Sequence, residues 1–111
     1  MSKIKIMLSS PMANKTDDEI NYERNEMANL LFDYYEDNCE IMSTVIENHT
    51  EKSALECFSE SILFMSMADV LAMGFGWENA RGCSLEHDVA LAYDVPIVYL
   101  DNINKEVKRN D

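Results

Sequence analysis

The stretch that decides the fold runs from Ala68 to Leu100, with the sequence ADVLAMGFGWENARGCSLEHDVALAYDVPIVYL. Its pattern predicts an apolar strand over Val70–Gly74, a polar loop over Gly74–Cys83, a helix over Gly82–Tyr93 and a second strand over Val95–Leu100. Two apolar strands joined by a helix are typical of a parallel sheet, because parallel strands need a long crossover connection. The loop then lies at the carboxyl ends of the strands, where open α/β sheets bind ligands.

The sequence before this stretch repeats the alternation of strand and helix. Two capping boxes, Thr16–Glu19 and Ser53–Glu56, each place a hydroxyl at a helix start with a glutamate three residues further on. They predict helices that run to about Tyr35 and to about Met67. An apolar run typical of a strand precedes each box: Lys3–Leu8 and Cys39–Ile46.

Strands that alternate with helices predict a single α/β domain over residues 1–111. We expect a three-layer α/β/α arrangement with a parallel sheet of about four strands in the order 2-1-3-4. Right-handed crossovers then place helices on both faces of the sheet. Residues 102–111 are mostly polar, so we expect a tail that can fray.

The chain is strongly acidic, with 21 acidic and 9 basic residues and a net charge of −12. This charge argues against sequence-independent binding to nucleic acid and disfavours an anionic membrane surface, since both need clustered Lys and Arg. Its ordinary explanation is solubility through self-repulsion. A sharper alternative is an acidic protein that mimics DNA or docks on a basic partner. The apolar segment Ile62–Trp77 is interrupted by Asp69 and is too short to span a membrane.

The three cysteines, Cys39, Cys57 and Cys83, have no metal-binding spacing and form no even disulfide set. We therefore expect a reducing, cytoplasmic environment, and the N-terminus enters a strand pattern without a signal peptide. His49 and His87 have no partner at metal-ligand spacing. With no GxGxxG or Walker loop either, the sequence predicts neither a metal nor a bound cofactor.

Glu86 is the strongest candidate for chemistry. At helical spacing it shares a face with small or apolar positions, and it lies near the start of its helix, whose positive end favours an ionised carboxylate. A carboxylate held ionised in a partly dry pocket can attack an anomeric carbon. The alternative is a surface glutamate beside His87 and Asp88. The positions predicted to share the face are Gly82, Val89, Ala90 and Tyr93.

Arg24 lies between Ile20 and Met27 on the apolar stripe of the first helix, so we expect it to point inward. There it approaches the turn Ser9-Ser10-Pro11-Met12, whose hydroxyls and amides can hold a ribose or a phosphate. Arg24 either grips an anion bidentately or pairs with a nearby acid.

The loop before Glu86 carries Trp77, Glu78 and Arg81. Trp77 can stack on a nucleobase, although a loop tryptophan more often packs against its own domain or an oligomer interface. Arg81 binds an anion or simply a neighbouring acid.

Two segments resemble a known family. IMLSSPMANKTDDEINYERNEM, residues 6–27, resembles the opening "isxPMxGkTdeei…eR" of the DUF4406 family of small phage and prophage proteins. The stretch from Ala68 resembles that family's "ADvvyfxxGWexaRGcxxEhxxAxxygixvi". The family belongs with the nucleoside 2-deoxyribosyltransferase-like proteins. That resemblance implies a flavodoxin-like fold, a homodimer or larger homo-oligomer, and a cytoplasmic protein of a bacterial host.

The same resemblance implies a function. Glu86 matches the family's glutamate nucleophile, and Ser9–Met12 matches its sugar or phosphate loop. Ser61 and Ala80 stand where the transferases carry acids, and Glu78 is a candidate substitute. We expect a nucleoside or nucleotide N-glycosidase or deoxyribosyltransferase-like protein, with Ser61 and Gly82 also at the ligand site. Two alternatives stay open: a non-catalytic protein that binds or sequesters a nucleotide, and an acidic inhibitor of a host protein.

Overall fold

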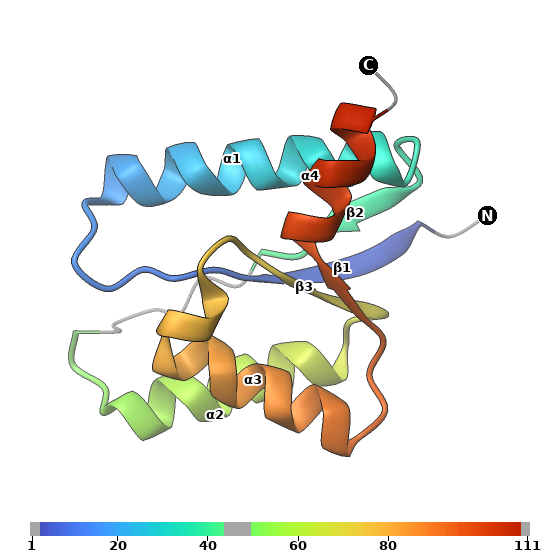
Figure 1. Ribbon diagram of the computed structural model, residues 1–111. Helices are drawn as coiled ribbons and strands as arrows, with labels where there is room; N and C mark the ends of the chain where they lie inside the picture. Colours follow the sequence, from blue (N-terminus) through green and yellow to red (C-terminus); the bar gives the residue numbers. More distant parts are fainter. Residues whose placement is uncertain (1–2, 44–49, 110–111) are drawn as a thin grey trace.

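The computed structural model describes residues 3–43 and 50–109 and alternates strands with helices as predicted (Figure 1). The elements follow in chain order: β1 (Ile4–Ser9), α1 (Asp17–Tyr34), β2 (Cys39–Ile41), α2 (Ala54–Ser66), β3 (Val70–Met73), the 3₁₀ helix η1 (Trp77–Asn79), α3 (Arg81–Ala92), β4 (Ile97–Tyr99) and α4 (Leu100–Arg109). None of the helices in the described ranges is long and apolar enough to cross a membrane.

The sheet is fully parallel, and its strand order β2-β1-β3-β4 is the one predicted. Helices α1 and α4 lie on one face of the sheet, and α2 and α3 lie on the other (Figure 1). The prediction of a three-layer α/β/α domain is therefore confirmed.

Both capping boxes form at the predicted residues. The hydroxyls of Thr16 and Ser53 each accept the backbone N–H three residues on, at 3.1 Å, while Glu19 and Glu56 reach back to the cap N–H. Strand β2 is shorter than the predicted Cys39–Ile46, since it ends at Ile41. Residues 44–46 of that prediction lie outside the described residues.

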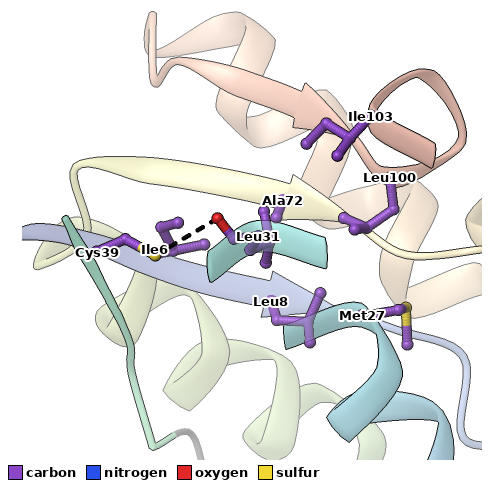
Figure 2. Close-up of a cluster of buried hydrophobic side chains, with 8 residues drawn as sticks. All are labelled: Ile6, Leu8, Met27, Leu31, Cys39, Ala72, Leu100 and Ile103. Carbon is purple, nitrogen blue, oxygen red and sulfur yellow. Dashed lines mark hydrogen bonds between the residues drawn. The ribbon is translucent and has the colours of Figure 1, made fainter. Parts of the chain in front are cut away.

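Each face of the sheet has its own apolar core, because successive side chains of a strand point to opposite faces. Ile6 and Leu8 of β1 point toward α1 and α4, whereas Met7 points toward α2 and α3. Figure 2 shows the first core, in which the Cys39 thiol also lies 3.8 Å from the Leu31 carbonyl oxygen that accepts its hydrogen bond. Its buried members are Ile6, Leu8, Met27, Leu31, Cys39, Ala72, Leu100 and Ile103.

The chain end differs from the prediction. We expected a fraying polar tail from Asn102, but residues 100–109 form helix α4, which packs on α1. Leu100 and Ile103, which are 0% and 4% exposed, lie one helical turn apart and enter the core beside α1. Two apolar residues in a polar segment are a weak sequence signal, but burying both is enough to anchor a short helix.

Candidate functional site

The candidate site lies at the carboxyl ends of β1 and β3, the two central strands. The chain leaves β1 toward α1 on one face and leaves β3 toward α3 on the other, so this point is the topological switch of the sheet, where open α/β folds bind ligands in a crevice. The loops that follow these strands touch. The N–H of Gly74 donates to the Ser9 carbonyl at 2.7 Å, and a Cβ on Gly76 would lie 4.0 Å from Pro11.

Glu86 reaches the end of β1 from α3. The Ser9 hydroxyl, at the last residue of β1, donates to Glu86 Oε1 at 2.9 Å. Ser9 is only 3% exposed, and Glu86 is half-buried. A hydrogen bond between positions 77 residues apart fixes the carboxylate at the sheet edge, so Glu86 is not the solvated surface residue of the alternative interpretation.

Burial dominates the ionisation of Glu86. Desolvation raises its pKa, and the hydrogen bond from Ser9 together with the nearby Arg24 charge only partly opposes this. We expected the helix N-terminus to favour the ionised form. Helix α3, however, begins at Arg81, so Glu86 lies beyond its first turn, where the effect of the helix dipole fades.

The buried face of α3 also differs from the prediction. Gly82 and Tyr93 were expected on the inward face, but both are exposed, Tyr93 at 78%. The inward face instead carries Cys83, Glu86 and Ala90, at spacings of three and four residues. The inward face is shifted by one residue from the predicted face, with Cys83 at the buried position that we had assigned to Gly82.

Arg24 comes to the site from α1, on the opposite face. Its Nη1 donates to the Ser10 hydroxyl at 2.9 Å and to the Leu8 carbonyl at 3.3 Å, as expected for an arginine that points toward the turn after β1. Burial lowers the pKa of Arg24, and the nearby Cys83 and Glu86 oppose this shift. Among the described residues no carboxylate lies within 4.0 Å of Arg24, which disfavours the alternative of a simple ion pair.

The turn after β1 is less open than we expected. The Ser10 side chain is bonded to Arg24, and the residue is only 7% exposed, so like Ser9 it is occupied within the protein. Pro11 is half-buried and Met12 is 56% exposed, so these two residues face solvent more than the serines do.

Trp77 packs against its own domain. Its indole stacks on the imidazole of His87, with ring centroids 4.3 Å apart and an interplanar angle of 28°. His87 Nε2 in turn lies 2.7 Å from the hydroxyl of Tyr99, within hydrogen-bonding distance. Tyr99 was not predicted as a site residue from the sequence. Its position at the end of β4, next to β3, is the feature that could have identified it.

Four predicted site residues stay apart from the carboxylate. Glu78, Arg81 and Gly82 are exposed around the start of α3, and Ser61 is half-buried on α2. Within the described ranges, Glu86 has one side-chain hydrogen bond, the one from Ser9, and none of these four residues makes a side-chain hydrogen bond to it. The structure thus brings Ser9, Ser10, Arg24 and Glu86 together.

Two hollows mark the surface. One, of about 380 Å³, runs between α1 and β2 and is lined by Arg24; the other, of about 360 Å³, lies between α1 and α4. Glu86 lines neither hollow, so Arg24 is the residue that joins the surroundings of the carboxylate to the larger one. In the part of the chain that the structure describes, no cluster of His, Cys, Asp and Glu is suited to a metal ion.

Comparison of the chain with family models, curated proteins and solved structures found no match. The resemblance of its two motifs to the DUF4406 family therefore stays a prediction. The fold and the geometry around Glu86 stand on the structure alone.

Proposed function

We propose that the chain binds a nucleoside or 5′-mononucleotide at the crevice between β1 and β3 and cleaves its N-glycosidic bond, with Glu86 as the nucleophile. One observation carries the proposal: the Ser9 hydroxyl holds Glu86 at 2.9 Å, at the sheet edge where open α/β folds bind ligands. The family resemblance of the two motifs adds the substrate class. It also leads us to propose a homo-oligomer that acts in the cytoplasm of a bacterial host.

The chemistry follows from this arrangement. Ionised Glu86 attacks the anomeric carbon, the bond to the base breaks, and water then hydrolyses the glycosyl–Glu86 intermediate with overall retention. Ser9 fixes Oε1, which leaves Oε2 for the attack. Among the described residues Arg24 donates through Nη1, so its other N–H groups are proposed to hold the sugar or a 5′-phosphate. Trp77, Glu78 and Arg81 would flank the base.

A non-catalytic nucleotide-binding protein is the second candidate. Ser61 and Ala80 stand where the transferases carry acids, so neither of these positions supplies an acid that could protonate the leaving base. This candidate predicts binding of a nucleotide without any product.

A panel of nucleosides and 5′-mononucleotides, with free base detected by mass spectrometry, tests both candidates. We expect base release by the wild type and its loss in Glu86→Gln, which keeps the size of the side chain and can still accept from Ser9. Asp94→Asn is the matched control, because Asp94 is exposed and its positive φ of 58° suits asparagine. Equal activity of Glu86→Gln and wild type would rule out Glu86 as the nucleophile. Binding without base release would favour the second candidate.

A further inference from the structure

Three neighbouring strands end in one row. Ser9 of β1 pairs in register with Met73 of β3, which pairs with Tyr99 of β4. Residues paired in register across a parallel sheet point to the same face. This is the face of α2 and α3, since Met73 and Tyr99 both pack in the core on that side.

Helix α3 is bonded to both ends of this row through consecutive residues. Glu86 accepts from Ser9 at one end, and His87 is hydrogen-bonded to Tyr99 at the other. Neighbouring strands are about 4.8 Å apart, so the backbones of Ser9 and Tyr99 are separated by about 10 Å. The carboxylate and the tyrosine hydroxyl thus lie at the same edge of the sheet with one strand end between them.

The His87–Tyr99 pair is held rigidly. The contact between Nε2 and the hydroxyl is short, at 2.7 Å, and the His87 side chain is only 13% exposed. Trp77 stacks on the imidazole and fixes the plane of the ring. Asp88 lies 3.9 Å from Nδ1, which is too long for a hydrogen bond but places a negative charge beside the ring.

The proposed reaction needs a group that protonates the leaving base, and Ser61 and Ala80 stand where the transferases carry acids. We propose that Tyr99, backed by His87, donates this proton. This inference rests on the proposed N-glycosidic cleavage at Glu86. The distance between the Glu86 end and the Tyr99 end of the row is compatible with this role, because a leaving base can take its proton at a ring atom away from the broken bond.

As Glu86 bonds to the anomeric carbon, the electron pair of the C–N bond passes to the base, and the base takes the proton of the Tyr99 hydroxyl. Nε2 of His87 then gives a proton to the tyrosine oxygen. In the second step water attacks the anomeric carbon, Glu86 leaves as a carboxylate, and the proton of the water returns through Tyr99 to His87.

Leaving-group dependence tests this role. Each variant is assayed on a natural mononucleotide, and on the corresponding 4-nitrophenyl glycoside, whose leaving group departs without a proton. We expect Tyr99→Phe to lose about 10²-fold or more on the natural substrate and to stay within a few-fold of the wild type on the nitrophenyl substrate. His87→Gln should show the same pattern, whereas Glu86→Gln should lose both activities.

The outcomes separate the two proposals. A Tyr99→Phe variant that cleaves the natural substrate like the wild type overturns the role of Tyr99 and leaves Glu86 as nucleophile intact. Equal losses on both substrates overturn it too, because they indicate a structural role. Fluorescence of Trp77, the single tryptophan of the chain, checks that its stacking survives in Tyr99→Phe. A wild type that cleaves neither substrate overturns the proposed function, and this inference with it.

Discussion

The two faces of the sheet are built differently. The core toward α1 and α4 is mostly branched: Ile6, Leu8, Leu31, Leu100 and Ile103 pack there with Met27, Cys39 and Ala72. The core toward α2 and α3 has one branched buried side chain, Leu71, among methionines and small residues, and Glu86 approaches Ser9 from this side. Its buried members are Met7, Met65, Leu71, Met73, Cys83 and Ala90.

The two cores therefore differ in how closely their side chains pack. Branched side chains specify close packing, whereas methionine adapts to irregular space and small residues leave room. We infer that the α1 side mainly stabilises the fold, while the α3 side tolerates a half-buried carboxylate.

Leu31→Ala should have the largest effect on stability. Leu31 is 0% exposed in the α1 core, so its truncation leaves a cavity and lowers the free energy of unfolding by about 3 kcal/mol. Leu91→Ala on α3, where Leu91 is 58% exposed, is the matched control and should stay within about 0.5 kcal/mol. Urea denaturation measures the free energy of unfolding of both variants. Similar losses would contradict the stabilising role of the α1 core.

Gly74→Ala should cost about 2 kcal/mol. A Cβ at this position would lie 2.9 Å from Met27 Sδ and 3.0 Å from the backbone oxygen of Ser9, so the strand end that holds Glu86 must shift. The same change at Gly82, where a Cβ meets nothing within 4 Å, should leave stability unchanged or raise it slightly, since alanine favours helices. Thermal unfolding of Gly74→Ala and Gly82→Ala measures the difference in stability between the two variants. A Gly74→Ala variant as stable as the wild type would contradict close packing around Gly74.

Met73→Leu sharpens the comparison of the two cores. Met73 is fully buried on the α3 side, and a swap that nearly conserves volume should cost less than about 1.5 kcal/mol. The reverse change at a branched position, Leu8→Met on the α1 side, should cost more if that core is the more closely fitted one. Equal urea midpoints for the two variants would remove the distinction between the faces.

The pH dependence of Glu86 should have the smallest effect. Because burial raises its pKa in the folded state, the folded protein holds this proton more tightly than the unfolded chain. The free energy of unfolding therefore falls as the pH rises from the usual glutamate pKa through the raised value. Glu86→Gln removes this fall, so its Tm relative to wild type should be higher at neutral pH than at acidic pH. A Tm difference that is constant with pH would contradict the direction of the shift.

The resemblance and the pattern together located Glu86 and Arg24, but not their partners. Glu86 was found because an acid interrupts an apolar helical face, and Arg24 because it lies between Ile20 and Met27. The serines after β1 were predicted to hold a ligand, whereas the structure bonds them to Glu86 and Arg24. Side chains on different strands and helices choose one another through packing, and spacing along the chain carries no record of that choice.

Local patterns predicted the alternation of strands and helices and both capping boxes, because these depend on residues a few positions apart. The parallel sheet was inferred from that alternation, since parallel strands need long crossover connections. Contacts between distant segments established that Leu100 and Ile103 anchor a helix, that burial outweighs the helix dipole at Glu86, and that Ser9, Met73 and Tyr99 share one row. Each of these depends on desolvation or contact between distant segments, and such effects exist only once the chain has folded.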